Sequence, residues 1–228
     1  MTYRAIERML PSFLRRYVLY FESAIEDSVS RFAACLPSEA RVLDAGAGEL
    51  SHARYFQRNA YIAVDLAVGD SSWDYGKLDA IADLTALPFR AGSFDACINI
   101  VTLEHIREPA CALREIERTL APGGQLLIIA PHEWEVHQSP HDYYRYTRHG
   151  LAYLFDTAGF SDYAIEPVGG YFRLISRRLL NGLQFFPGPW FFLAAIFLAP
   201  PALILPCFDW LDRERNFTLG YICIAKKR

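Results

Sequence analysis

The chain has 228 residues, which is enough for one large domain or for one domain with an elaboration. Its formal net charge of -3 gives no reason to expect a nucleic-acid partner. The five cysteines are odd in number and lack C-x-x-C spacing, which argues against a disulfide or zinc framework and predicts reduced thiols in a cytosolic protein. Charged residues interrupt the N-terminal stretch, so no secretory signal is expected there.

Residues 1–40 are predicted to form a helical segment ahead of the main domain. From Tyr3 to Leu36, apolar residues recur every three or four positions, and Pro11 breaks or starts one of the one or two amphipathic helices that this pattern indicates. The apolar stripe is expected to cover a sheet. In a second interpretation, Tyr17 and Tyr20 line a binding site.

A tight turn after a buried strand is the central feature of the sequence. An apolar pair precedes Asp44, Gly46 and Gly48, so the backbone after the strand can approach a ligand closely. A dinucleotide fingerprint requires a third glycine where Ser51 stands, and the carboxylate that opens the turn does not suit it, which disfavours a nicotinamide cofactor. A short helix is expected next, from His52 to Arg58.

Polar residues also end the following three predicted strands. Asp65 ends the strand from Tyr61, 21 residues beyond Asp44, where an acid can accept both ribose hydroxyls of a nucleoside. Because open α/β sheets bind ligands beyond the carboxyl ends of their strands, these polar tips are expected to share one crevice. The further tips are Asp83 with Leu84 after the third strand, and Asn99 in the fourth strand, Phe94–Ile100.

The Asp-Ala-Gly-Ala-Gly string at 44–48 resembles the first motif of the class I methyltransferases that depend on S-adenosylmethionine (SAM). Glu49 stands where many members carry a third glycine. The resemblance implies that Asp44, Gly46 and Gly48 hold the methionine end and the ribose side of SAM. It further implies that Asp65 binds the ribose and that Asp83 and the Leu84 backbone meet the adenine, with Asn99 as a fourth polar tip of the cofactor site.

The stretch from Val101 to Ile106 looks like the post-strand motif of the ubiquinone-biosynthesis-like (type 11) methyltransferases, in which the loop covers the cofactor. His105, within it, is either catalytic or a cap or packing residue. An amphipathic helix with proline in its first turn is predicted from Pro109 to Leu120. A glycine turn then leads into the fifth strand, Gln125–Ala130.

The loop from Pro131 to Thr147 holds three of the six histidines and several aromatic residues. Methyl transfer to a hydroxyl needs a proton acceptor, so His132, His137 and His141 are the predicted bases, with Asp142 able to orient one of them. A metal site of these three histidines and Asp142 is an alternative, although their spacing matches no familiar ligand set. A packed lid without a base is another.

An apolar tract separates the last two predicted strands, Ala164–Val168 and Phe217–Ala225. No charged residue occurs from Leu179 to Phe208, and Leu183 to Leu205 is long enough to span a bilayer. The two strands must pair in one sheet, so the tract is expected to return to the side it left. Its prolines should divide it into pieces of roughly ten residues, which favours a monotopic membrane hairpin over a dimer interface or a substrate cover.

The resemblance therefore implies an α/β fold with a doubly wound, seven-stranded, mostly parallel sheet, an antiparallel last strand and an apolar helical insertion. The expected parts are the helical segment 1–40, a SAM-binding core at 41–170, the insertion at 171–215 and the last strand at 216–228.

The function expected from the sequence is SAM-dependent O-methylation of an amphiphilic, lipid-linked or glycan acceptor at the inner face of a membrane. Two alternatives are a catalytically silent scaffold that binds SAM and a soluble, dimeric methyltransferase of a small metabolite. Methylation at nitrogen, carbon or sulfur is a further possibility that these residues do not separate from O-methylation.

Overall fold

The computed structural model describes residues 12–70 and 72–228. The predicted helix break near Pro11 lies outside the described residues. The described residues form two compact units: one comprises Asp27–Glu166 with Tyr221–Arg228, and the other comprises residues 12–26 with Pro167–Gly220. The four-part division expected from the sequence stays a prediction, and the compact units follow other boundaries.

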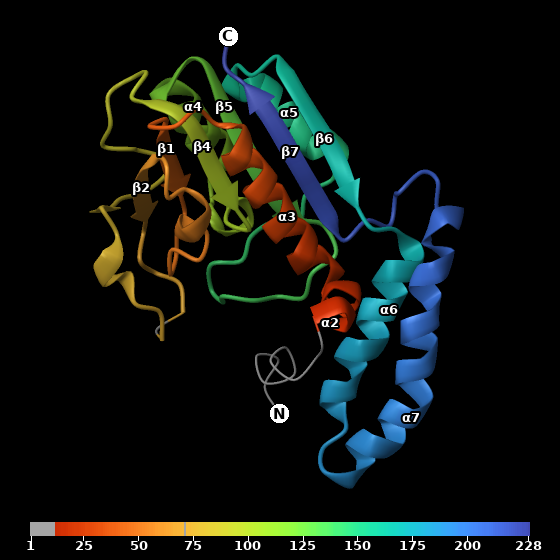
Figure 1. Cartoon of the computed structure of the whole chain (residues 1–228). Helices are drawn as coiled ribbons and strands as arrows, with labels where there is room; N and C mark the ends of the chain where they lie inside the picture. The colour runs from red at the N-terminus through yellow and green to blue at the C-terminus, as the bar shows by residue number, and fades with distance from the viewer. Residues whose placement is uncertain (1–11, 71) are drawn as a thin grey trace. The chain divides into compact units, whose positions relative to one another are not determined.

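A seven-stranded sheet has the strand order β3-β2-β1-β4-β5-β7-β6. The pairs β1 with β2, β1 with β4, β2 with β3 and β4 with β5 are parallel. Figure 1 shows β7 running against the strands beside it, which confirms the predicted antiparallel last strand. The strands are β1 Arg41–Ala45, β2 Ala60–Asp65, β3 Ala80–Ile81, β4 Phe94–Ile100, β5 Leu120–Pro131, β6 Asp162–Val168 and β7 Gly220–Lys226.

The central strands are buried on both faces, which explains their continuous apolar runs. Leu43 of β1 pairs with Ile62 of β2 and with Cys97 of β4, and both Leu43 and Cys97 are fully buried. The helices α4 (Pro109–Thr119) and α5 (Arg148–Ala158) pack against each other in the same unit. Their apolar faces contribute to the core cluster that also contains the central strands.

The sequence sets the ends of α5. The Thr147 side chain accepts a hydrogen bond from the Gly150 N–H at the N-terminus, and Gly159 adopts a left-handed φ of 96° at the C-terminus. Proline opens α4, as predicted. A longer helix, α3 (Tyr20–Cys35), precedes β1 and fits the predicted amphipathic segment.

The helix predicted from His52 to Arg58 is wrong. The connection from β1 to β2 contains only a 3-10 turn, η1 (Ala53–Tyr55). Gly48 and Leu50 both have a positive φ, 51° and 59°, so the chain after the strand begins with successive turns. Helical backbone then ends at Phe56, whose φ of -106° and ψ of 26° lie outside the α-helical region.

The second unit contains a helical hairpin (Figure 1). The hairpin consists of α6 (Tyr171–Gly182), the 3-10 turn η4 (Leu183–Phe185) and α7 (Pro189–Ile204). The unit also contains α2 (Ser12–Val18) and the 3-10 helix η5 (Leu205–Leu211). Glu22 forms an ion pair with Arg177 at 2.9 Å, and the Tyr17 hydroxyl donates to the Leu203 carbonyl at 2.7 Å. Tyr17 thus contributes to the packing of this unit.

The prediction that prolines divide the apolar tract into pieces of roughly ten residues is wrong. α7 has 16 residues and includes Pro200 and Pro201. Each proline removes an N–H donor, but its fixed φ is compatible with a helix, and the surrounding leucine and alanine residues favour one. The helical run Pro189–Leu211 is, by length and composition, able to cross a membrane, and 11% of its apolar window is buried.

Candidate functional site

A cavity of about 970 Å³ lies at the carboxyl ends of the parallel strands. Its walls come from the segments that follow β1, β2, β3, β4 and β5, so five strand tips that are distant in sequence share one space. This is the position at which open α/β sheets bind ligands. Seven residues predicted from the sequence line it: Gly46, Gly48, Asp65, Asp83, Leu84, His137 and His141.

The two glycines of the turn have positive φ values, 96° at Gly46 and 51° at Gly48. A Cβ at Gly46 would lie 2.2 Å from the Thr102 side chain, and one at Gly48 would lie 3.1 Å from the Trp73 ring. Glycine is therefore required here by the backbone conformation and by protein neighbours that also line the cavity. Neither Trp73 nor Thr102 was expected from the sequence.

Asp65 fixes the turn to the end of β2. One carboxylate oxygen accepts the Gly48 N–H at 3.0 Å, and the other accepts the Ala67 N–H at 2.8 Å. Each oxygen keeps a lone pair for a further donor. Asp83 likewise accepts the backbone and hydroxyl donors of Thr85 through a single oxygen, Oδ1, each at 2.8 Å.

Asp44 and Asn99 do not belong to the cavity lining. Asp44 is buried and accepts a short hydrogen bond from the Tyr61 hydroxyl. Burial raises the pKa of Asp44 to about 7, against the lowering effect of that hydrogen bond. Asn99 is also buried, and its amide donates to the Ala45 carbonyl at 2.6 Å. Both side chains thus brace the end of β1 beneath the glycine turn.

The three histidines predicted as bases separate into two groups. His137 and His141 line the cavity, whereas His132 does not. His132 Nδ1 is 2.7 Å from the Tyr146 carbonyl, and its ring packs against Tyr221. The predicted four-residue metal set that includes His132 is consequently not brought together.

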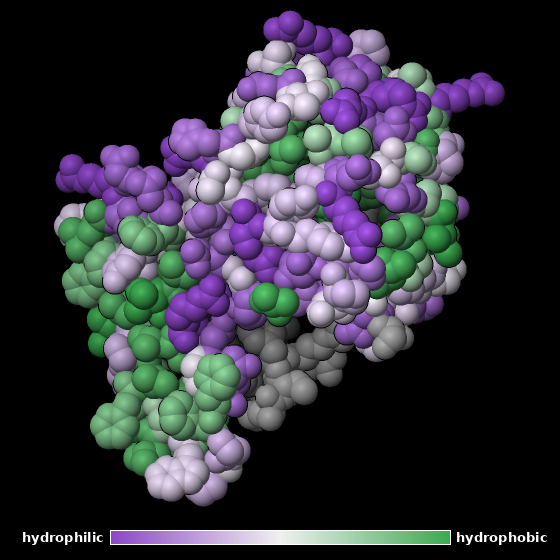
Figure 2. Space-filling view, turned by 180° about the vertical axis from the view of Figure 1, so that it is seen from behind, coloured by the Kyte–Doolittle hydropathy of each residue, from purple (hydrophilic) through white to green (hydrophobic). Residues whose placement is uncertain are grey.

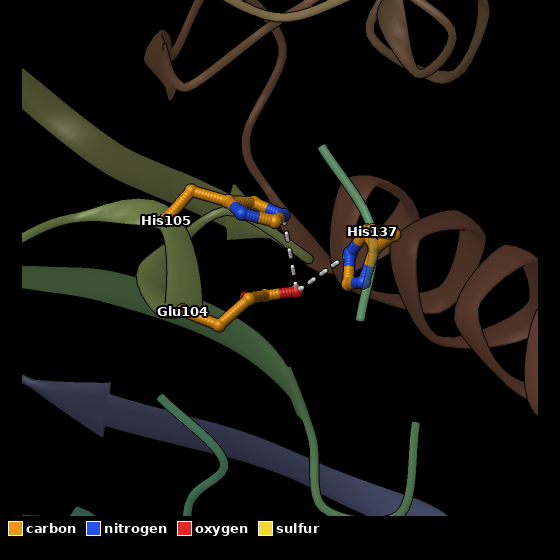
Figure 3. A group of neighbouring side chains, drawn as sticks. All are labelled: Glu104, His105 and His137. Atoms are coloured by element: carbon orange, nitrogen blue, oxygen red, sulfur yellow. Dashed lines mark ion pairs between the residues drawn. The ribbon is translucent and has the colours of Figure 1, made fainter. Parts of the chain in front are cut away.

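A different cluster forms at the wall between β4 and the loop after β5 (Figure 3). Glu104 and His105 come from the 3-10 turn η3 (Leu103–His105), and His137 comes from the loop. Glu104 Oε1 lies 3.7 Å from His105 Nε2 and 3.9 Å from His137 Nε2. We call these three residues the Glu-His-His cluster.

Glu104 is fully buried, and neither of its carboxylate oxygens has a hydrogen-bond partner within the described structure. Burial raises the pKa of Glu104 to about 8 and lowers the pKa of His105. Asp142, in contrast, is held by Arg145 at 2.6 Å, and this hydrogen-bonded contact lowers the pKa of Asp142 to about 2. The charged form of Asp142 is therefore stabilised within the loop, whereas burial without a cation disfavours the charged form of Glu104.

Glu104 is a further residue of this region that the sequence analysis passed over. An acid four residues after an apolar strand, with a histidine beside it, was the available signal, but its complete burial cannot be read from local spacing. His105 was left between a catalytic and a packing role, and it lines the cavity.

Residues 43–128 match the protein family described as "Methyltransferase domain". The tRNA (carboxymethyluridine(34)-5-O)-methyltransferase alkbh8 of Xenopus tropicalis is 30% identical over 115 residues, which cover 48% of this chain and 18% of that protein. The demethylmenaquinone methyltransferase of Renibacterium salmoninarum is 36% identical over 96 residues, covering 39% of this chain and 40% of that protein. The chain thus spans less than half the length of these relatives.

Among solved structures, the 1,6-didemethyltoxoflavin-N1-methyltransferase of Burkholderia thailandensis, in complex with S-adenosylhomocysteine, has a TM-score of 0.57. It is 18% identical, and the match covers 94% of this chain and 85% of that one, so this likeness concerns the fold. Because the first relative is named for a tRNA substrate, the net charge does not exclude a nucleic-acid acceptor, contrary to the expectation from composition.

SAM is the cofactor of the family, and complexes with SAM or its product occur among the structural neighbours. The domain match, the strand order and the position of the cavity agree with one another. The chain therefore contains a methyltransferase domain at residues 43–128, within a fold like that of the class I SAM-dependent methyltransferases.

Proposed function

We propose that this protein transfers the methyl group of SAM to an oxygen atom of an acceptor bound in the same cavity. The observation that carries the proposal is that one cavity has the glycine turn and the acidic strand tips on one side and imidazoles with aromatic rings on the other. A volume of about 970 Å³ leaves room for a nucleoside cofactor together with a small acceptor group.

The residues on the first side fit SAM. Gly46 and Gly48 line the cavity with backbone atoms alone, and Asp65 retains acceptor capacity for ribose hydroxyls. The buried Leu84 and the exposed Asp83 offer an apolar surface and an acceptor for the adenine. When bound, SAM supplies an activated methyl group on a sulfonium. Asp44 and Asn99 would act one layer below, by supporting the turn.

The residues on the second side fit an oxygen nucleophile that must lose a proton. His137 and His141 line the cavity, and Trp134 and Tyr143 offer aromatic surface to the acceptor. His132 is less suited than either, because it does not line the cavity and its ring packs edge-on against Tyr221. Precise positioning of the acceptor oxygen is the main contribution that we assign to this wall.

Calorimetry with S-adenosylhomocysteine tests the cofactor half of the proposal. Asp65→Ala should weaken binding at least about tenfold, since the change removes the ribose acceptor and frees the Gly48 N–H. Asp162→Ala, an acid lost from the exposed start of β6, is the matched control and should bind as the wild type does. Equal affinity in Asp65→Ala and wild type would contradict the assignment.

Transfer of a labelled methyl group to components of a cell extract tests the activity itself. We expect a labelled product with an O-methyl group, which mass spectrometry of the extracted product identifies. Label on nitrogen, carbon or sulfur would reject the oxygen acceptor, and a protein that binds SAM without any transfer would be a silent scaffold.

We further propose that the acceptor is amphiphilic and held at a membrane. Support comes from α7, where Phe192 is 70% and Phe197 is 69% exposed, in a helix with almost no polar face. Figure 2 shows hydrophobic side chains gathered over the helical hairpin. Unshielded apolar surface of this kind marks an interaction site, and a bilayer surface suits its composition.

Flotation with vesicles of phosphatidylglycerol and phosphatidylethanolamine tests this part. The wild-type chain should float with the vesicles, and the double variant Phe192→Glu, Phe197→Glu should stay behind, because charges oppose insertion into the acyl region. Tyr153→Glu alters an equally exposed aromatic residue on α5 and should float normally. A wild-type chain that remains in solution as a stable dimer would assign the hairpin to an oligomer interface instead.

A further inference from the structure

We propose that the Glu-His-His cluster binds one divalent transition-metal ion through Glu104 Oε, His105 Nε2 and His137 Nε2. The inference stands on the geometry of the cluster. Only its consequence for the acceptor rests on the function proposed above. Among the described residues, these three side chains bring one ligand atom each within 4.8 Å of one another.

The distances suit a shared ion. Bonds of about 2.1 Å from a four-coordinate zinc to nitrogen and oxygen ligands place neighbouring donor atoms about 3.4 Å apart. The donors of the cluster lie 3.7 and 3.9 Å from the Glu104 oxygen. Small side-chain movements of a few tenths of an ångström would complete the coordination, and the rings of His105 and His137 already stand nearly perpendicular, at 84°.

The second layer of contacts directs the correct nitrogen of each imidazole toward the ion. His105 Nδ1 is 2.6 Å from the His141 carbonyl, and His137 Nδ1 is 3.0 Å from the Glu135 carbonyl. A carbonyl only accepts, so the His105 contact places the proton on Nδ1 and leaves Nε2 its lone pair. At His137, the carbonyl contact at 3.0 Å favours the same tautomer over the longer approach of the Arg145 guanidinium to Nδ1, at 3.4 Å. Such backbone contacts commonly orient metal-bound histidines and fix their tautomer.

The buried carboxylate supplies the independent observation. Glu104 is fully buried, yet both oxygens lack a hydrogen-bond donor, and the neighbouring His105 Nε2 also lacks a partner. Two of these unpartnered atoms, Glu104 Oε1 and His105 Nε2, lie 3.7 Å apart, and such buried polar atoms are costly in a folded protein unless something binds between them. The nearby guanidinium of Arg145 is already paired with Asp142 and does not fill this role.

The ligand chemistry selects the class of ion. Two imidazoles and one carboxylate suit zinc, iron(II) or manganese(II), whereas magnesium and calcium prefer all-oxygen surroundings. His105 and His137 both line the cavity, so the remaining coordination positions would face the acceptor side. An acceptor oxygen bound there would be fixed in place and made more acidic. His137 is then a ligand, and His141 is the imidazole that remains for proton transfer.

Titration of the chelator-treated full-length protein with Zn²⁺, and separately with Mn²⁺, tests the proposal. We expect one equivalent of at least one of these ions, and loss of at least about tenfold in affinity in both Glu104→Gln and His137→Ala. Co²⁺ serves as a spectroscopic probe: its visible absorption should appear in the wild type and be lost in both variants. His149→Ala removes a histidine from the exposed surface of α5 and should behave as the wild type does.

Binding of S-adenosylhomocysteine by each variant, measured in parallel, separates loss of the metal site from loss of the fold. Variants that retain this binding but lose the metal support the proposal. Two results overturn the proposal. One is metal binding that survives both substitutions. The other is a wild type that binds none of the three ions more tightly than the Glu104→Gln and His137→Ala variants do. A wild type that binds metal but not S-adenosylhomocysteine would reject the proposed function and leave the metal site intact.

Discussion

The cavity wall and the helical hairpin depart from ordinary burial in opposite directions. Around the cavity, ionisable groups such as Asp44 and Glu104 are removed from water. Along α7, large apolar groups such as Trp190 and Ile196 are left in it. Buried charge without compensation costs folding free energy, and exposed apolar surface costs solubility. Both regions thus indicate a missing contact, a ligand in the first case and an apolar surface in the second.

Truncation of a buried ring in the core of the sheet unit and of an exposed ring in the hairpin should give the largest difference in stability. Phe155→Ala in α5 should lower the free energy of unfolding by about 3–5 kcal/mol, because the side chain is fully buried in the core. Phe197→Ala, at 69% exposure in α7, should change it by less than about 0.5 kcal/mol. Urea unfolding measures both. A large loss in Phe197→Ala would mean that the hairpin surface is already covered within the chain.

The buried acid beneath the glycine turn should make stability depend on pH. The folded-state pKa of Asp44, about 7, lies above its unfolded value, so the folded chain binds the extra proton between these values. The contribution of Asp44 to stability is fully present below its unfolded pKa and falls as the pH rises toward 7, by at most about 4 kcal/mol. Asp44→Asn cannot ionise and should lose this slope, so it gains stability relative to the wild type at pH 8.

Denaturant titrations at pH 5 and pH 8 measure this difference. Asp95→Asn is the control, because the hydrogen bonds from Arg41 lower the pKa of Asp95 and leave nothing to titrate in that range. An identical slope in wild type and Asp44→Asn would show that Asp44 stays charged in the folded protein. Burial would then raise the pKa of Asp44 too little to affect the stability of the fold.

Gly46 and Gly159 have the same φ of 96°, so they separate the cost of the backbone conformation from the cost of steric contact with neighbouring side chains. Gly159→Ala, with no atom within 4 Å of the added Cβ, should cost only the left-handed conformation, about 1–2 kcal/mol. Gly46→Ala should cost about 1 kcal/mol more, since its Cβ would meet Thr102 at 2.2 Å. Thermal unfolding of the two variants measures the difference. Equal costs would mean that Thr102 moves aside freely.

Much of the cavity was predictable because its residues follow local rules. A glycine turn after an apolar strand, and an acid at the end of the next one, are patterns within a few positions, and Gly48 and Asp65 do line the cavity. Asp44 obeyed the same pattern but lies below the lining, because its side chain turns to Tyr61. Sequence spacing gave the strand end and not the direction of the side chain.

The sequence by itself determined where the central strands lie, that a proline opens α4 and that a glycine turn follows β1, because periodicity and backbone conformation are properties of neighbouring residues. Only the tertiary structure decided which polar groups meet. Glu104 and His137 belong to separate loops, and their approach depends on the pairing of β4 with β5. It also decided that α7 continues through Pro200 and Pro201, since one helix or two short ones satisfy the same local composition.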